Sequence, residues 1–465
     1  MNAPMLWIFL PMVVGGLMLL IRNEKAVTLI ACLFTLFLTL AAWLIPIDSQ
    51  LTLGGWSFKL ASSQEILGRR LILTSADRAF LALVYGSSMV WFIPTTSLQI
   101  ARRLIPLGLG ITALLVAALA VEPFLYAALL IETAVLFSVP LLSTPGQKPG
   151  KGLLRFIIFQ TLAVPFILFS GWILAGIEAN PGNVNLVTQA AIFLGLGFAF
   201  LLAVFPFYTW IPLLAEEVHP YILGFVFWML PTVTLFFGLS FMDRYAWLRD
   251  TPALGTVLSA AGALMVTSGG ILAVFQRHLA RIMGYAVIIE TGFSLLALSL
   301  VDRMGITIFL LLLIPRTLCL MIWSLGLAIL KDHNPNLNLN SVNGFVRVWP
   351  FAGLALILSN LSLAGMPLLA GFPAHQAVWE ELARESLPLA FWVFFGSFCL
   401  AASAIRVLAS MAKAPEGAHW EAHETTSQRV LLWIGWLAMF LLGLFPNWVL
   451  PLWTKLPALF EHLGQ

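Results

Sequence analysis

The chain is poor in charged residues. Only 10% of its 465 residues are charged, whereas 60% are hydrophobic, and the mean hydropathy is +0.97. A soluble globular domain carries about 25% charged residues, so this composition excludes a large soluble domain and predicts a protein that crosses the membrane many times. The net charge of +3 gives no basic surface for nucleic acid.

Cysteine is scarce, and the motifs that hold redox groups are absent. Cys32, Cys319 and Cys399 lie in apolar runs, and their spacing fits neither a metal site nor a disulfide framework. Buried thiols are therefore expected. The chain also has no glycine-rich phosphate loop and no haem-attachment motif. We expect no cofactor, no bound metal and no redox chemistry in this chain.

Long apolar runs fill most of the sequence. A membrane-spanning helix needs about 20 apolar residues, and about fourteen such runs occur. Their approximate limits are 4–21, 26–46, 77–96, 104–121, 124–142, 153–176, 186–208, 220–242, 252–274, 281–301, 305–330, 348–369, 387–408 and 428–451. The first run lacks a small-residue cleavage site and is expected to be retained. Because only the connections 47–76 and 409–427 are long, the sequence predicts one membrane domain, residues 1–465.

The basic residues of the loops predict an orientation. Numbered by the span before them, the odd loops hold thirteen Lys and Arg residues, and the even loops with the tail hold nine. Cytoplasmic loops carry the excess of Lys and Arg. The odd loops are therefore expected to face the cytoplasm, which places both chain termini outside.

A few ionisable side chains interrupt the apolar runs near their middle. Glu132 stands in ALLIETAVLF, Glu290 in YAVIIETGF and Arg316 in LLLLIPRTLCL. A charge at the centre of a spanning helix costs roughly 2.5–3.5 kcal/mol on insertion scales. Each of these side chains is therefore expected to face the bundle interior or a hydrated cavity.

Two interpretations of these charges stay open. Glu290 and Arg316 lie at matching depths in consecutive runs, so a structural ion pair and a proton-conducting role are equally good explanations. Glu132 has no partner nearby in the sequence, which favours a functional role for it over a structural one.

Two of the runs contain prolines that break a helix. Pro206 and Pro212 interrupt the seventh run, and Pro367 and Pro373 interrupt the twelfth. Proline removes a backbone hydrogen bond and kinks the helix. Broken helices at matching places in two halves of a membrane protein mark transport sites, although single kinks are common.

The spacing of these features predicts an internal repeat. Residues 104–242 and 252–408 each contain five runs, and an odd number of helices inverts the second unit relative to the first. Glu132 and Glu290 fall in the second run of each unit, and the proline breaks fall in the fourth. The predicted fold is all-α and polytopic, with about fourteen membrane helices, two inverted five-helix repeats and broken helices 7 and 12.

Four segments, in this order along the chain, resemble the antiporter-like membrane subunits of respiratory complex I. This family is shared with multisubunit cation/proton antiporters and membrane-bound hydrogenases. The resemblance covers nearly the whole chain, and it lies in ALLIETAVLFSVPLL (128–142), VFPFYTWIPLLAEE (204–217), RHLARIMGYAVIIETGFSLLAL (277–298) and LSLAGMPLLAGFPAHQ (361–376).

The resemblance implies a proton relay at the middle of the membrane, but several relay residues differ. Glu132 stands at the family's glutamate, whereas the lysine of broken span 7 is replaced by Leu201 or a neighbour. Glu290 replaces the histidine of span 10, and His375 replaces the lysine of span 12. All seven lysines of the chain lie outside span centres. The proton-relay candidates are therefore Glu132, Glu290, Arg316 and His375.

Further titratable residues lie beside the broken segments. Glu216, Glu217 and His219 form a group that we interpret as a loop cap or a proton station at a cavity mouth rather than a metal site. The run GAHWEAHETT (417–426) is interpreted as solvated surface.

Three functions remain possible at this point. The first is a membrane-arm subunit of a complex I-type oxidoreductase, with a proton relay that is altered or lost and no catalysis by the chain alone. The second is a structural subunit without ion transport, and the third is a component of a multisubunit cation/proton antiporter. The expected partners are other membrane subunits, the lipid bilayer, and protons or sodium ions. The expected location is the bacterial inner membrane.

Overall fold

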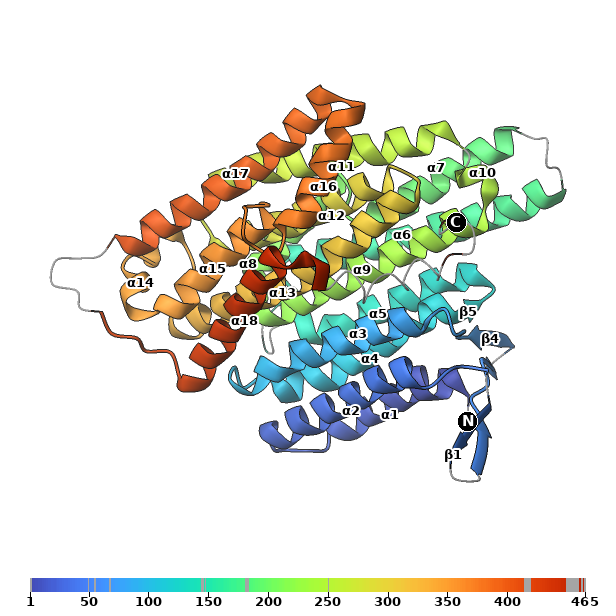
Figure 1. Cartoon of the computed structure of the whole chain (residues 1–465), viewed down its shortest axis with the longest axis horizontal. Helices are drawn as coiled ribbons and strands as arrows, with labels where there is room; N and C mark the ends of the chain where they lie inside the picture. The colour runs from blue at the N-terminus through green and yellow to red at the C-terminus, as the bar shows by residue number, and fades with distance from the viewer. Residues whose placement is uncertain are drawn as a thin grey trace.

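Helices run along most of the chain, as its apolar runs dictate (Figure 1). The computed structural model describes residues 2–48, 50–53, 56–66, 68–143, 146, 148–179, 184–249, 251–413, 420–448, 460 and 463. The first half holds α1 (Leu10–Met18), α2 (Glu24–Leu44), α3 (Arg78–Phe92), α4 (Ala101–Ala120), α5 (Ala127–Leu142), α6 (Lys151–Ala179), α7 (Val184–Leu201), α8 (Trp210–Glu217), α9 (Pro220–Arg244) and α10 (Ala246–Arg249). The second half holds α11 (Pro252–Phe275), α12 (Leu279–Leu298), α13 (Arg303–His333), α14 (Phe345–Val348), α15 (Pro350–Leu363), α16 (Phe372–Glu385), α17 (Leu387–Ala412) and α18 (Thr426–Leu444).

Short elements extend or join these helices. A π-helical turn, η1 (Met5–Phe9), precedes α1. The 3₁₀ turns are η2 (Ile93–Thr96), η3 (Phe124–Tyr126), η4 (Phe207–Thr209), η5 (Leu339–Ser341) and η6 (Pro446–Trp448). The strands are β1 (Gln50–Leu53), β2 (Trp56–Lys59), β3 (Ser63–Ile66), β4 (Arg69–Ile72) and β5 (Val121–Glu122).

The all-α polytopic fold is confirmed. Within the described residues, 11 helices are long and apolar enough to cross a membrane, and three shorter apolar helices cover Met5–Met18, Asn185–Leu201 and Pro350–Leu363. The short helices fall in the first, seventh and twelfth predicted runs. A total of about fourteen crossings, and the repeat limits 104–242 and 252–408, stay predictions.

The two expected helix breaks are present, and they change two predicted boundaries. The run 186–208 was expected to be one span, but α7 ends at Leu201 and α8 begins at Trp210. The run 348–369 likewise divides, because α15 ends at Leu363 and α16 begins at Phe372. In both cases the broken segment contains one of the expected prolines.

The connection 47–76 forms strands that the sequence analysis did not predict. β1 pairs with β2 as an antiparallel hairpin, and β3, β4 and β5 form a second antiparallel sheet. The Ala3 amide donates a hydrogen bond to the Ala61 carbonyl at 2.8 Å. The strands thereby hold the start of the chain at one end of the helix bundle, on the right in Figure 1.

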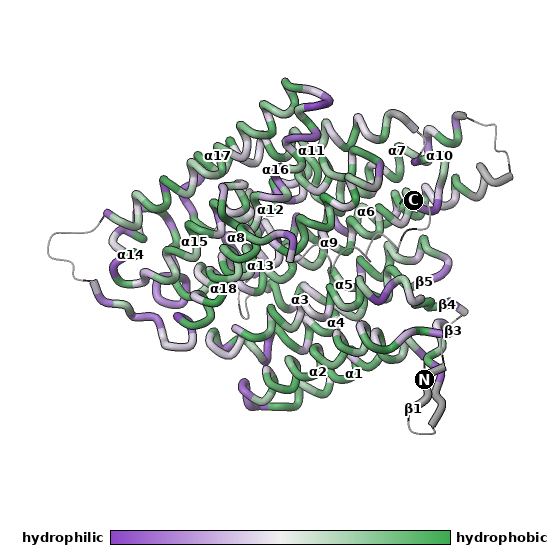
Figure 2. Tube along the Cα trace, in the orientation of Figure 1, coloured by the Kyte–Doolittle hydropathy of each residue, from purple (hydrophilic) through white to green (hydrophobic). Residues whose placement is uncertain are grey.

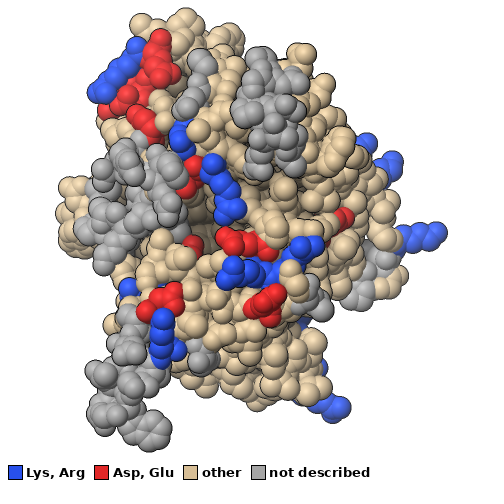
Figure 3. Space-filling view, turned by 90° about the vertical axis from the view of Figure 1, so that its right-hand side faces the viewer, with Lys and Arg blue, Asp and Glu red and all other residues tan. Residues whose placement is uncertain are grey.

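Charged groups gather at this end of the bundle (Figure 3). Arg244 Nη2 lies 3.9 Å from Glu122 Oε1, and the Leu463 amide donates to Asp243 Oδ1 at 3.0 Å. Figure 2 shows that the helices are hydrophobic along their length and that hydrophilic residues concentrate at helix ends and connections. This distribution is the one that a bilayer selects, because its core leaves charges unsolvated.

The helices differ strongly in their burial. The most apolar part of α12 is 94% buried and that of α9 is 89% buried, whereas the figure for α18 is 22%. α12 and α9 therefore form the centre of the bundle. Any side chain on α12 must find its polar partners inside the protein rather than in lipid or water.

Candidate functional site

Two ionisable side chains meet at the centre of the second half of the molecule. Glu290 projects from the central helix α12, and His375 stands near the start of α16, just after the second break. His375 Nε2 lies 3.1 Å from Glu290 Oε1, and each side chain is 1% exposed. The distance is that of an ion pair, but neither atom has a well-aligned hydrogen-bond partner.

The other ring nitrogen fixes the protonation of the histidine. His375 Nδ1 lies 2.7 Å from the Gly371 carbonyl oxygen, which can only accept a hydrogen bond. Nδ1 therefore carries a proton, and the proton between Nε2 and the carboxyl is a separate one. Two unprotonated atoms 3.1 Å apart would turn lone pairs toward each other. A proton on Nε2 or on Glu290 Oε1 would remove this repulsion.

Arg316 completes the group but does not pair as expected. Its side chain is fully buried, and Nη2 donates to Thr291 Oγ1 at 3.3 Å, while Nε and Nη1 have no hydrogen-bond partner. The structural ion pair of Glu290 with Arg316, one of the two interpretations left open by the sequence, does not form, because the ion-pair partner of Glu290 is His375. The charges of Arg316 and Glu290 still interact at longer range.

The second break is built by small residues that bring backbone close to His375. Gly365 and Leu368 have φ of 75° and 70°, and a Cβ on Gly365 would lie 3.1 Å from His375 Cβ. Glycine meets both demands at position 365 without strain. The Gly371 amide donates to Ser362 Oγ at 3.1 Å, which satisfies a backbone donor that the break exposes.

The prolines occupy different places in the two breaks. Pro206 and Pro367 lie in the non-helical segments, where their missing amide proton breaks no helical hydrogen bond. Pro373 is the second residue of α16 and Pro212 the third residue of α8, and both positions tolerate proline in the first turn of a helix.

The first break is held by a residue that the sequence analysis missed. Gln160 of α6 is 3% exposed, and its Nε2 donates to the Leu201 carbonyl at 3.2 Å and to the Phe200 carbonyl at 3.4 Å. These carbonyls end α7, and Ala203 follows with a φ of 51°. The sequence feature that could have identified this residue is a single glutamine in the apolar run FIIFQTLAV.

Glu132 lies apart from the central group. It is half-buried on α5, and no hydrogen bond or ion pair joins it to any described residue. Leu129 and Leu136 on the same side of the helix are 38% and 51% exposed. Of the four relay candidates, Glu290 and His375 are brought into contact, Arg316 lies beside them, and Glu132 does not join them.

Two cavities lie along the first break. One, of about 20 Å³, is lined by Gln160, Leu201 and Thr291, so it extends from the end of α7 to the hydrogen-bond partner of Arg316. The other, of about 290 Å³, is lined by Pro206, Arg281 and seven further residues. The break is thus bordered by polar groups on α6 and α12.

The expected cavity-mouth group has three separate roles. Arg281 Nε donates to Glu216 Oε2 at 2.6 Å, so Glu216 reaches the rim of the 290 Å³ cavity. Glu217 accepts from the Gly152 and Leu153 amides at 2.8 and 3.2 Å and thereby caps α6.

His219 Nε2 lies 3.9 Å from Asp332 Oδ1. Burial, together with the charges of Lys331 and Arg103, lowers the pKa of His219 to about 4. No group of three or more His, Cys, Asp or Glu residues fit for a metal occurs among the residues that the structure describes.

The run 417–426 is not simply solvated surface. Residues 417–419 lie outside the described part, but Glu424 is 1% exposed. Its Oε1 accepts from the Phe351 and Ala352 amides at 2.9 and 3.2 Å. The expectation was wrong for this residue, because the first turn of α15 has free amide donors that attract a carboxylate.

Known proteins are similar to this chain in sequence. NADH-quinone oxidoreductase subunit 14 of Thermus thermophilus is 28% identical over 258 residues, which are 53% of this chain and 56% of that protein. Subunit N of Pelobacter propionicus is 24% identical over 350 residues, 68% of this chain and 70% of that protein. The aligned part thus spans little more than half of the Thermus subunit.

Solved structures agree on the fold. The Mrp complex from Dietzia sp. matches with a TM-score of 0.82 and 14% identity, covering 100% of this chain and 97% of that one. Respiratory complex I from Thermus thermophilus with bound NADH matches with a TM-score of 0.74 and 19% identity, covering 100% and 99%. The family model for the transmembrane region of NADH:quinone oxidoreductase and Mrp antiporter subunits matches residues 157–401, which is more than half of the sequence. The chain therefore belongs to the NADH:quinone oxidoreductase/Mrp antiporter transmembrane family, as an antiporter-like membrane subunit.

Proposed function

We propose that the chain is a membrane-arm subunit of a complex I-type proton-translocating oxidoreductase, with a relay that uses Glu290, His375 and Arg316 in place of mid-membrane lysines. The observation that carries the proposal is the buried contact of 3.1 Å between His375 and Glu290. In this proposal the chain takes up and releases protons, and the redox steps belong to other subunits.

The contact supports a proton transfer within the pair. Nδ1 keeps its proton, which it donates to the Gly371 carbonyl. The pair then has two states with a net charge of zero: a neutral imidazole beside a carboxylic acid, and an imidazolium beside a carboxylate. Moving one proton across 3.1 Å interconverts them. A histidine and a buried carboxyl are suited to such a transfer because environment can bring their proton affinities close together.

Arg316 would set the balance rather than carry the proton. An arginine stays protonated in proteins, so its positive charge is fixed. This charge stabilises the carboxylate form of Glu290 and repels the imidazolium form of His375, and only the first effect favours the imidazolium–carboxylate state. Buried donors normally have acceptors, and Arg316 Nε and Nη1 have none among the residues that the structure describes. This supports transient contact of the guanidinium with water or with Glu290 during transport.

The ion moved is proposed to be the proton. A hard cation such as sodium requires several oxygen ligands. Glu290 is instead faced by Nε2 of His375 and lies in the field of Arg316, and both of these side chains repel a metal cation when they are charged.

The setting of the subunit follows from the same proposal. Other membrane subunits would be its partners, and the bacterial inner membrane its location. The end of the bundle that holds the strands, Ala3 and Leu463 would face outward, as the loop charges predict.

The test is proton translocation by the native assembly carrying His375→Gln. Electron transfer and vesicle acidification are measured on the same membranes, so that the ratio of protons to electrons is obtained. We expect His375→Gln to lower this ratio, since glutamine cannot exchange a proton. Glu385→Gln on the exposed end of the same helix is the matched control and should leave the ratio unchanged. An unchanged ratio in His375→Gln would favour a structural subunit without ion transport.

A multisubunit cation/proton antiporter is the second candidate. It is supported by the fold similarity to the Mrp complex. Purification from native membranes separates the two. Recovery with quinone-reducing subunits supports the first candidate, and recovery of an ion-exchanging complex without redox activity supports the second.

A further inference from the structure

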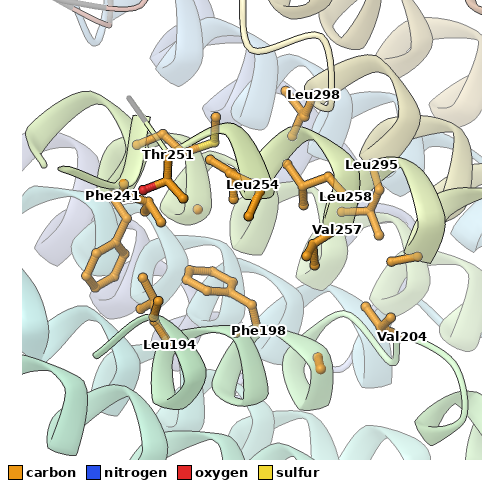
Figure 4. Close-up of a pocket in the computed structure, with 18 of the residues that line it drawn as sticks. Leu194, Phe198, Val204, Phe241, Thr251, Leu254, Val257, Leu258, Leu295 and Leu298 are labelled. Atoms are coloured by element: carbon orange, nitrogen blue, oxygen red, sulfur yellow. The ribbon is translucent and has the colours of Figure 1, made fainter. Parts of the chain in front are cut away.

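A large apolar cavity opens between helices of the two halves, away from the Glu290–His375 pair. Its volume is about 510 Å³, within the roughly 300–1,000 Å³ usual for ligand sites. Its walls come from α7, α9, α11 and α12 and from the segment that joins α9 to α11 (Figure 4). The lining contains no charged residue, and threonines are its main polar members, so a hydrocarbon fits and an ion does not.

Along α7 the cavity has about the length of one leaflet of a bilayer. On α7 it extends from Val187 to Ala199, which at 1.5 Å per residue is about 18 Å. Half of the hydrocarbon core of a bilayer is about 15 Å. At one end lies Thr251 (Figure 4), whose hydroxyl donates to the Trp247 carbonyl in the segment between α9 and α11. Tryptophan is enriched at membrane interfaces. At the other end lies Val204 in the first break.

The length and polarity of the cavity select among hydrocarbon occupants. The cavity follows α7 for about 18 Å, and its lining side chains are almost all apolar. A single extended polymethylene chain matches this length and polarity.

We propose that this cavity binds one acyl chain of a membrane phospholipid, from the leaflet on the side of the strands. The headgroup lies at the interface beside Trp247 and Thr251. The chain end reaches Leu202 and Val204, which flank the left-handed Ala203 of the first break. The lipid thereby packs against the first break at Leu202 and Val204.

One glycine allows the site to be filled without disturbing the fold. A Cβ on Gly195 would meet no atom within 4 Å, although Gly195 lines the cavity. In Gly195→Phe the ring therefore occupies the space of the acyl chain. Gly16 on α1 is the matched control, since a Cβ there also meets no atom within 4 Å and the residue is exposed and lines no part of this cavity.

The experiment uses a phosphatidylethanolamine with a photoreactive group in its acyl chain, incorporated into native membranes that contain the full chain and its partners. After illumination, mass spectrometry maps the labelled peptides. We expect labelling on α7 and α11 at the cavity, reduced by at least about fivefold in Gly195→Phe and unchanged in Gly16→Phe.

Equal cavity labelling in wild type and Gly195→Phe would overturn the proposal. Preferential labelling by a probe with an isoprenoid quinone tail would also overturn it and assign the cavity to a quinone. The readout is independent of proton translocation, so it stands or falls separately from the proposed function.

Discussion

The two helix breaks of this molecule share a shape and differ in chemistry. Each joins a short apolar helix to an amphipathic one, and each contains a non-glycine residue in the left-handed region, Ala203 in the first and Leu368 in the second. The first break is bordered by an amide, Gln160, whereas the second sits beside a buried pair, Glu290 and His375.

This difference separates scaffold from function. A neutral amide can satisfy the carbonyls that a broken helix exposes, so the break as such requires no charge. The ionisable groups at the second break are therefore not needed to satisfy the break. Burying them is costly, and the proposed role in handling protons would account for that cost.

The largest expected effect on stability comes from removing the buried carboxylate of Glu290 in the second half. Glu290→Leu leaves the buried Arg316 without its compensating carboxylate and should lower the free energy of unfolding by about 3–5 kcal/mol. Thermal unfolding of the purified assembly measures this.

The double variant Glu290→Leu/Arg316→Met removes both charges and should recover part of the lost stability without recovering proton translocation. If the double variant is less stable than the single one, the two residues do not compensate each other across the cluster.

The next effect concerns a titratable group of the first half that lies outside the spans. His219 has a usual pKa of 6.5 that is lowered to about 4 in the folded chain. Between these values the unfolded chain binds a proton that the folded chain does not. Stability is therefore complete above about pH 6.5 and falls as the pH drops toward 4, by roughly 3 kcal/mol.

The dependence of the melting temperature on pH checks this point. His219→Gln should flatten the profile between pH 4 and 6.5, whereas His423→Gln, at an exposed position, should not. A profile that stays as steep in His219→Gln would assign the acid sensitivity to other groups.

A smaller effect is expected at the amide of the first break. Gln160→Leu keeps much of the side-chain volume but leaves the Phe200 and Leu201 carbonyls without a donor, at a cost of about 1–3 kcal/mol. Gln376→Leu, at an exposed position on α16, should cost no more than about 0.5 kcal/mol. Equal costs for the two variants would mean that the first break does not depend on Gln160.

The sequence predicted the features that depend on single residues and their immediate neighbours. Prolines predicted both breaks, and charges in apolar runs singled out Glu290 and Arg316. The pairing of Glu290 with His375 could not be predicted, because hydropathy and spacing do not reveal which distant helices pack together. The strands after residue 49 were missed because they form at the membrane surface, where no apolar run marks them.

The smallest effect is expected at Glu132. It is half-buried and has no partner among the described residues, so Glu132→Gln should change the free energy of unfolding by no more than about 0.5 kcal/mol. Its effect on the proton-to-electron ratio should be smaller than that of Glu290→Gln. A loss as large as that of Glu290→Gln would place the first half on the proton route.

Infrared difference spectroscopy of the native assembly during turnover tests the central claim most directly, because it detects the carbonyl stretch of a protonated carboxylic acid. The account predicts a carboxylic-acid band that changes with turnover, disappears in Glu290→Gln and persists in Glu132→Gln. A band that survives unchanged in Glu290→Gln would show that Glu290 does not exchange a proton, and would contradict the account.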